Sequence, residues 1–259
     1  MSLPSKSQPR VVIESITPSV DQGRFAVKRI AGDDVAVEAD VFADGHDAVC
    51  ARLLHRSASD PAWRSTPMTA LGNDRFAAGF VVVELGLYEY TLEAWVDSIA
   101  SWRRGLIVKH SAGQDVAVDL LHGAELVRAT AARAVAARAD ESVVRRLDQW
   151  ATELAAADSS IAQRVDRARS DELLELAQRY PDPEQVLRRE PPLTVRVDRP
   201  RARYSSWYEL CPRSTATSPW RARHARGLCR EARGHRGDGL RCGLSAAHPS
   251  DRHDEPQGT

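Results

Sequence analysis

Hydrophobic and polar residues alternate with two different periods along this chain, and the change of period divides it into segments. From residue 10 to about residue 109 the period is close to two, as in a β-strand with one buried face. Two apolar rows stand out, namely Val35, Val37, Ala39 and Val41, and then Tyr88, Tyr90, Leu92, Ala94 and Val96. Shorter candidate strands, separated by Gly-, Asp- and Asn-containing turns, are residues 11–16, 48–54, 63–69 and 75–82. Short strands at this spacing predict an antiparallel β-sandwich of immunoglobulin-like type.

After Gly113 the period becomes that of helices. Residues 125–157 are dominated by Ala, Arg, Leu and Glu, which are strong helix formers. One continuous apolar stripe runs through this segment and consists of Val143, Leu147, Trp150 and Leu154. The pattern predicts a long helical segment with one buried face.

Two serines mark the starts of further helices. Ser160 and Ser170 are candidate N-caps for residues 161–169 and 171–180. The prolines that follow end the second of these helices, and a short helix is predicted at residues 184–189. Three or four helices in succession are enough for a small bundle.

The strand period resumes at Leu193, Val195 and Val197, so we expect the chain to leave the sheet, build helices and return to it. The predicted fold is therefore an all-β sandwich with an inserted α-helical bundle. The expected parts are a disordered N-terminus at 1–9, a sandwich at 10–111 plus 192–203, and a helical insert at 112–191.

Charge and composition narrow the classes of partner. The chain has 36 Lys plus Arg and 36 Asp plus Glu, so no overall field favours nucleic acid or a membrane surface. No apolar run approaches the roughly 20 residues of a membrane span, and the polar start shows no signal peptide. The four cysteines do not require a disulfide framework. We expect a cytoplasmic protein without a cofactor.

Aromatic residues are the candidate binding residues. Tyr88 and Tyr90 share a row with Leu92 and are expected in the core. Trp63, Trp95 and Trp102 are better candidates for a sugar platform, because Trp95 points to the opposite side of that row. Of these, Trp95 and Trp102 are the candidates for stacking on sugar rings. Packing against a neighbouring layer or subunit is the alternative role for both.

Acidic residues cluster in two predicted turns. Asp33 and Asp34 form one cluster, and Asp44, His46 and Asp47 form the other. Neither cluster has a second set of side chains from another segment that would complete a metal or acid–base site. We expect ordinary solvated turns and no metal.

Several motifs resemble one enzyme family. They are VFADGHD (41–47), LGNDRF (71–76), YEYTLEAWVD (88–97), SWRR (101–104), AGQDVA (112–117) and ARYSSWYELCPRS (202–214). Together they resemble the N-terminal region of the alpha-1,4-glucan:maltose-1-phosphate maltosyltransferases of the alpha-amylase superfamily. Cys211 departs from the pattern, since an aromatic residue is expected there. The resemblance implies homodimer contact through the sandwich and its helices, followed by a (β/α)8 barrel of which residues 204–219 would be a linker and first-strand remnant.

Residues 220–259 show no strand or helix period and are rich in Arg, Gly and His. A basic tail that binds nucleic-acid phosphates is one interpretation, and a zinc site at Cys229, His235, Cys242 and His248 is another. That spacing lacks a close cysteine pair. A third interpretation is a frameshift near residues 211–220, since the codons of residues 240–258 read one nucleotide later permit FDVVYLPPIHPIGTTNRKG, similar to the family's second barrel strand. We therefore expect a disordered, out-of-frame tail.

The resemblance implies a retaining transfer of maltosyl units from maltose 1-phosphate to the non-reducing ends of α-1,4-glucans, in alpha-glucan (glycogen) biosynthesis. An Asp would attack the anomeric carbon and a Glu would act as acid and base. Both lie on barrel strands in the family, so no catalytic residue is assigned, and this chain alone is predicted to be inactive. A free-standing glucan-binding or scaffold module is the alternative function.

Overall fold

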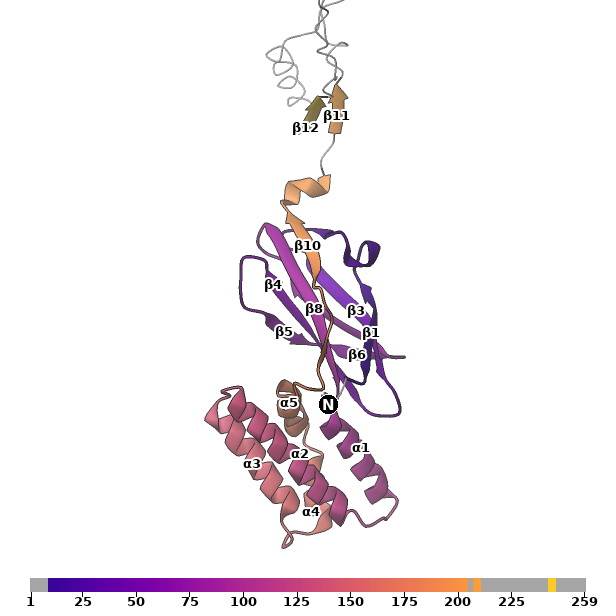
Figure 1. Cartoon of the computed structure of the whole chain (residues 1–259), viewed down its shortest axis with the longest axis vertical. Helices are drawn as coiled ribbons and strands as arrows, with labels where there is room; N and C mark the ends of the chain where they lie inside the picture. Colours follow the sequence, from indigo (N-terminus) through magenta and orange to yellow (C-terminus); the bar gives the residue numbers. More distant parts are fainter. Residues whose placement is uncertain (1–8, 205–206, 211–241, 246–259) are drawn as a thin grey trace, which may run out of the picture. The chain divides into compact units, whose positions relative to one another are not determined.

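The computed structural model describes residues 9–204, 207–210 and 242–245 (Figure 1). The chain divides into two compact units, Met1–Val197 and Asp198–Thr259, and each is described by itself.

The strands of the larger unit form two β-sheets. One sheet has the order β1-β3-β7-β6, and the other has the order β2-β10-β8-β4-β5, with β9 pairing to β8. The strand bounds are β1 Val11–Thr17, β2 Val27–Ile30, β3 Asp34–Ala43, β4 Val49–Ser57, β5 Arg64–Pro67, β6 Thr69–Gly72, β7 Arg75–Val81, β8 Gly86–Val96, β9 Leu187–Arg188 and β10 Leu193–Asp198. The pairs β1–β3, β3–β7 and β6–β7 in the first sheet are antiparallel, as are β4–β5, β4–β8, β8–β9 and β8–β10 in the second. The predicted segment 63–69 is divided into β5 and β6, and β2 was not predicted.

The alternating rows of the sequence face one apolar core. Val35, Val37, Ala39 and Val41 of β3 are buried there together with Tyr88, Tyr90, Leu92 and Ala94 of β8. Leu193, Val195 and Val197 of β10 join the same core. Burial of a large apolar side chain contributes roughly 1.5–3 kcal/mol, so these rows fix which side of each strand faces inward. The predicted inward rows are confirmed.

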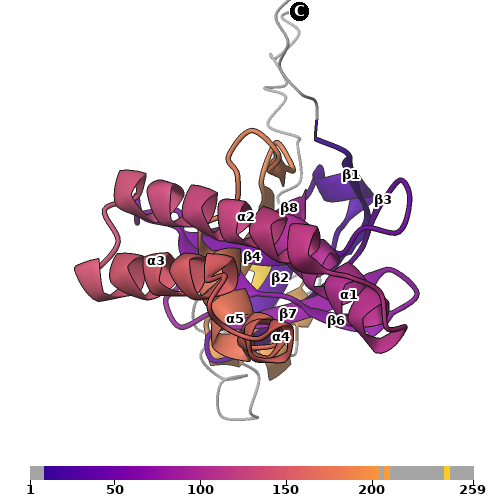
Figure 2. The same ribbon diagram turned by 90° about the horizontal axis from the view of Figure 1, so that it is seen from below.

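Five helices of the described residues follow β8 in the sequence. They are α1 Ser98–Ser111, α2 Ala117–Ala136, α3 Glu141–Ala155, α4 Ile161–Ala168 and α5 Asp171–Arg179. Figures 1 and 2 both show α2 and α3 side by side. The predicted stripe lies at their contact, with Leu147, Trp150 and Leu154 buried in a second apolar core and Val143 packed against it.

Side-chain caps begin several helices as the sequence suggested. The Ser160 hydroxyl accepts a hydrogen bond from the Gln163 backbone N–H, and the Gln163 side chain completes a capping box. The Ser170 hydroxyl accepts from the Leu173 backbone N–H in the same way. Both caps satisfy backbone donors that the first turn of a helix leaves unpaired.

The helical region begins earlier than the change of period indicated. Residues 98–111, which alternation assigned to the sandwich, form α1, and Ile99, Trp102 and Leu106 enter the helical core. Asp97 directly follows the last residue of β8 and caps α1, so the transition needs no intervening loop. Residues 187–188 are also a strand, in place of the predicted short helix at 184–189. They pair with Glu93 and Ala94, which satisfies backbone groups at this edge of β8.

In the smaller unit the structure describes three elements. These are the 3-10 helix Pro200–Tyr204 and the parallel pair of strands β11 Trp207–Leu210 and β12 Cys242–Ser245. β11 lies within the expected linker and strand remnant at 204–219, and β12 lies within the segment expected to be a disordered tail. The remaining residues of both segments, like the candidate zinc ligands Cys229, His235 and His248, lie outside the described residues.

Candidate functional site

The outer face of the larger sheet carries a ladder of charged pairs. Residues of β4 and β8 that face away from the core stand opposite each other, as Cys50 and Trp95, Arg52 and Glu93, and Arg56 and Glu89. Arg52 lies 2.6 Å from the Glu93 carboxylate, and Arg56 lies 2.6 Å from that of Glu89. Opposite charges directly across an antiparallel pair stabilise it by a fraction of a kcal/mol to about 1 kcal/mol. These carboxylates are therefore balanced by guanidinium groups.

A cleft of about 660 Å³ lies between this outer face and α5, and we call it the Trp95 cleft. Cys50, Arg52 and Trp95 line its sheet side, and Gln178 and Arg179 line its helix side. Trp95 itself is only 5% exposed. The Arg52 guanidinium lies over its ring at 5.3 Å from the centroid, close enough for a cation–π interaction.

Asp97 connects four elements at one end of this cleft. Its carboxylate accepts hydrogen bonds from the Ala100 backbone N–H of α1 at 2.9 Å and from the Gln178 side chain of α5 at 2.9 Å. The Cys50 thiol of β4 donates to the same carboxylate at 3.3 Å. Burial, together with the Asp97 charge, raises the pKa of Cys50, which keeps the thiol protonated and unreactive.

Trp102 lies in a different place from Trp95. It is 8% exposed and belongs to the helical core, with its Nε1–H donating to the Asp119 carbonyl at 2.7 Å. The structure does not bring the two candidate tryptophans together. Their burial favours the packing role over sugar stacking.

Trp63, also a candidate from the sequence, is half-buried. Two guanidinium groups lie over its ring, that of Arg56 at 4.4 Å and that of Arg188 at 4.7 Å from the centroid. Arg188 comes from β9, far along the chain from the loop that carries Trp63. No local signal in the sequence could have predicted this stacking.

The acidic turns behave as ordinary turns. Arg10 forms ion pairs with Asp44 at 2.9 Å and Asp47 at 3.1 Å, and the Asp44 carboxylate raises the pKa of Arg10. The Asp33 carboxylate accepts a hydrogen bond from the Ile30 backbone N–H. Within the described residues no group of three or more His, Cys, Asp or Glu side chains could hold a metal ion.

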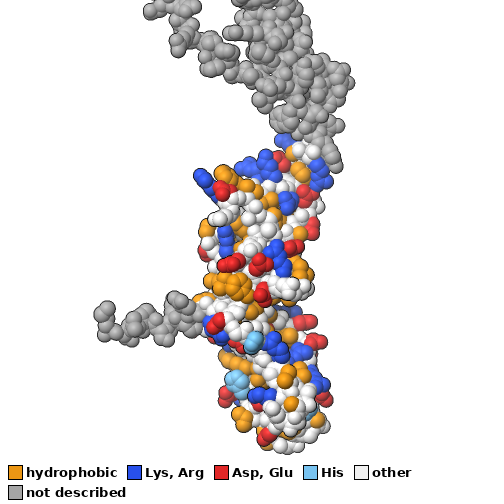
Figure 3. All heavy atoms as spheres, turned by 90° about the vertical axis from the view of Figure 1, so that its right-hand side faces the viewer, with side chains coloured by type: hydrophobic (Ala, Val, Ile, Leu, Met, Phe, Trp, Pro, Cys, Tyr) orange, Lys and Arg blue, Asp and Glu red, His pale blue; other side chains and the backbone are white. Residues whose placement is uncertain are grey.

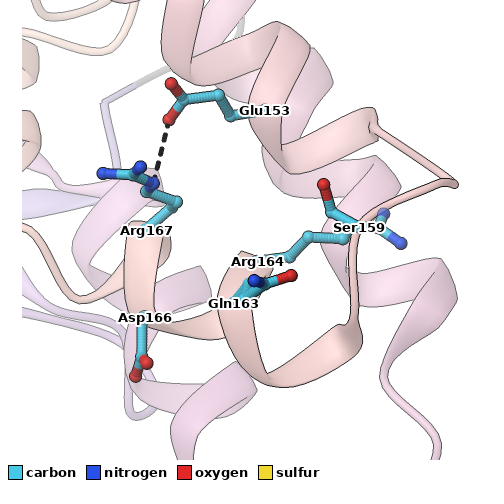
Figure 4. Close-up of a pocket in the computed structure, with 6 residues that line it drawn as sticks. All are labelled: Glu153, Ser159, Gln163, Arg164, Asp166 and Arg167. Carbon is cyan, nitrogen blue, oxygen red and sulfur yellow. Dashed lines mark ion pairs between the residues drawn. The ribbon is translucent and has the colours of Figure 1, made fainter.

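A polar hollow of about 420 Å³ lies at the start of α4 (Figure 4). The Glu153 and Arg167 side chains face each other across it at 3.3 Å. Arg164 is buried and donates to the Leu154 carbonyl, which ties α4 to the end of α3. These contacts hold α3 and α4 together.

On the face drawn in Figure 3, acidic and basic side chains of the described residues are interspersed, so that face shows no large patch of one charge. No helix of the described part of the chain is both long and apolar enough to cross a membrane.

Comparison with known proteins gives a consistent result. Residues 9–199 match the family model for alpha-1,4-glucan:maltose-1-phosphate maltosyltransferase, domain N/S. The chain is similar to the maltosyltransferases of that name from Chlorobaculum tepidum (41% identity over 83% of this chain), Myxococcus xanthus (40% over 79%) and Rhodospirillum rubrum (36% over 82%). The aligned region covers 31%, 31% and 32% of those relatives, so the chain spans about a third of their length.

Proposed function

Because this chain belongs to the alpha-1,4-glucan:maltose-1-phosphate maltosyltransferase family, we propose that it is the N-terminal part of such an enzyme. The enzyme would transfer maltosyl units from maltose 1-phosphate to the non-reducing ends of α-1,4-glucans. The observation that carries the proposal is the match of residues 9–199 to domain N/S, because that range includes both sheets and all five helices of the larger unit.

The proposed architecture is an immunoglobulin-like sandwich with an inserted helical bundle, continued in the whole enzyme by a (β/α)8 barrel. The order of elements supports an insert, because β8 precedes the helices and β10 pairs with β8 after them, with Leu193 opposite Tyr90. A retaining mechanism needs a nucleophilic carboxylate and an acid–base carboxylate about 5 Å apart. Both are proposed to lie on barrel strands, so the role of this chain is structural.

We expect the 259-residue chain to release no phosphate from maltose 1-phosphate in the presence of maltooligosaccharide, because both catalytic carboxylates are proposed to lie on barrel strands. A phosphate-release assay checks this, with a full-length relative such as the Chlorobaculum tepidum enzyme as the positive control. Saturable release by the purified chain, in proportion to its concentration, would contradict the proposal.

Contact between two subunits is proposed as the second part of the structural role. Along α2, most exposed positions on one face carry apolar or small side chains, namely Val118, Leu121, Ala129, Ala132, Val135 and Ala136, with the exposed Glu125 among them. Val118 is 78% exposed, Leu121 50% and Val135 59%. An exposed apolar stripe of this kind is typical of a surface that meets a partner, and a two-fold dimer would place the same stripe on both sides.

Leu121→Glu is expected to weaken self-association at least tenfold, because each dimer would bury two carboxylates in an apolar contact. Analytical ultracentrifugation over a range of concentrations measures the effect. Val83→Glu is the matched control, since Val83 is 70% exposed in the loop between β7 and β8. A chain that is monomeric at every concentration, or a Leu121→Glu variant that dimerises as well as the parent, would rule out this face.

The alternative function, a free-standing glucan-binding or scaffold module, depends on accessible aromatic rings. Trp95 and Trp102 expose 5% and 8% of their surface, so neither presents a ring face to a sugar. The structural role within a maltosyltransferase is therefore the better supported proposal.

A further inference from the structure

A second cleft adjoins the Trp95 cleft and shares Arg52 and Arg179 with it. Its volume is about 500 Å³, and its walls come from the outer face of the larger sheet, the end of α2 and the segment after α5. Four arginines and one glutamate are its charged lining residues, namely Arg52, Arg133, Arg179, Arg188 and Glu93. We call it the arginine cleft.

The charges of this lining are not balanced. Glu93 serves two arginines, with Arg52 at 2.6 Å and Arg188 at 3.6 Å from its carboxylate oxygens. Arg188 also lies 2.9 Å from Glu190. Among the described residues, no carboxylate lies within ion-pair distance of Arg133 or Arg179.

Arg133 is held in place by neutral groups. Its Nε–H donates to the Tyr180 carbonyl at 2.9 Å, and its terminal N–H donates to the Thr130 hydroxyl at 2.7 Å. Burial lowers the pKa of Arg133, while Asp182 acts on it through space in the opposite direction. An arginine remains charged at neutral pH even so, and the guanidinium is thus a half-buried, positioned cation.

Arg188 is a further positioned arginine of the cleft wall. Its buried Nε lies 2.9 Å from a Glu190 carboxylate oxygen without the geometry of a hydrogen bond, and its guanidinium also lies over the Trp63 ring. Arg188 therefore adds a fixed positive charge to the lining, whereas Arg133 and Arg179 are the arginines without an ion-paired carboxylate among the described residues.

We propose that the arginine cleft binds a phosphate-type anion, either inorganic phosphate or the phosphate group of a small phosphate monoester. Guanidinium groups match the oxygens of a phosphate in a forked, charge-assisted geometry. The cleft volume is within the range of small-molecule sites. The four arginines come from β4, α2, α5 and β9, so a bound anion would join the sheet to the helices.

Titration of the 259-residue chain with inorganic phosphate, maltose 1-phosphate and maltose, at constant ionic strength, tests the proposal. Backbone amide shifts are followed by NMR. We expect saturable shifts near residues 179–188 with the two phosphate compounds and none with maltose. Arg179→Ala and Arg133→Gln should each weaken binding roughly tenfold, the effect of losing one charge-assisted contact.

Arg196→Ala is the control, because Arg196 is an exposed arginine of β10 that does not line the cleft. Tighter binding of maltose 1-phosphate than of phosphate would support the cleft as a monoester site, and equal binding would support it as a site for the free anion. The proposal is overturned by the absence of saturable shifts with either phosphate compound. It is equally overturned if maltose binds as well as maltose 1-phosphate, or if Arg196→Ala weakens binding as much as Arg179→Ala.

Discussion

Asp97→Ala is expected to lower the free energy of unfolding of the larger unit by about 2–4 kcal/mol. Loss of the α1 N-cap accounts for about 1 kcal/mol of this. The rest comes from the Gln178 amide and the Cys50 thiol, which lose their acceptor in a part-buried site, at about 1–3 kcal/mol. Asp97 is itself buried, so water does not readily replace the carboxylate.

The substitution should also make the sheets and the helices unfold at different urea concentrations, because Asp97 joins β8 and β4 to α1 and α5. Urea unfolding followed by circular dichroism and by tryptophan fluorescence measures both effects. We expect coincident transitions in the parent chain and divergent transitions in the variant.

Asp140→Ala is the matched control. Asp140 caps α3 through the Ser142 backbone N–H but is exposed and bonds to no other element in the described structure. Its replacement should cost only the cap, about 1 kcal/mol. Equal effects of the two substitutions would mean that the contacts of Asp97 to Cys50 and Gln178 do not stabilise the fold.

Gly123→Ala is expected to destabilise the helical bundle by about 1–3 kcal/mol, although alanine is the better helix former. A Cβ at Gly123 would overlap the Cζ2 and Cε2 atoms of the Trp102 ring. That ring cannot move freely, because it is buried and its N–H is bonded to the Asp119 carbonyl. α1 and α2 must therefore separate.

Gly105→Ala, in the same pair of helices, is expected to change the free energy of unfolding in the opposite direction. Gly105 lies within α1, and a Cβ there would meet no atom within 4 Å. We expect a gain of about 0.5–1 kcal/mol from helix propensity alone. Thermal unfolding of both variants compares them directly, and a stabilised Gly123→Ala variant would show that Trp102 can repack.

The alternation of residues was sufficient to predict the inward rows of the sandwich, since a strand with one buried face has no other period. Val37 and Tyr90 are buried for this reason. The helical stripe at Leu147 and Trp150 was predictable on the same grounds. The start of α1 was not, because residues 98–111 carry mixed polarity and Asp97 reads equally well as the end of a strand.

The surroundings of the candidate tryptophans could be known only from the tertiary structure. Trp95 was predicted to face away from the core, and it does, but the sequence could not place Arg52 over its ring or α5 beyond it. Trp102 belongs to the helical core because Gly123, on the next helix, leaves room for its ring.

By itself, the sequence determined the strand-rich part, the helical part and the family of this protein. The first two follow from local periods, and the family follows from contiguous motifs. Only the tertiary structure decided which charged groups meet. Arg52, Arg133, Arg179 and Arg188 are separated by up to 136 positions in the sequence and line one cleft because β9 pairs with β8 after five helices. Such a charge cluster has no period along the chain, because it is created by strand pairing and helix packing between distant segments.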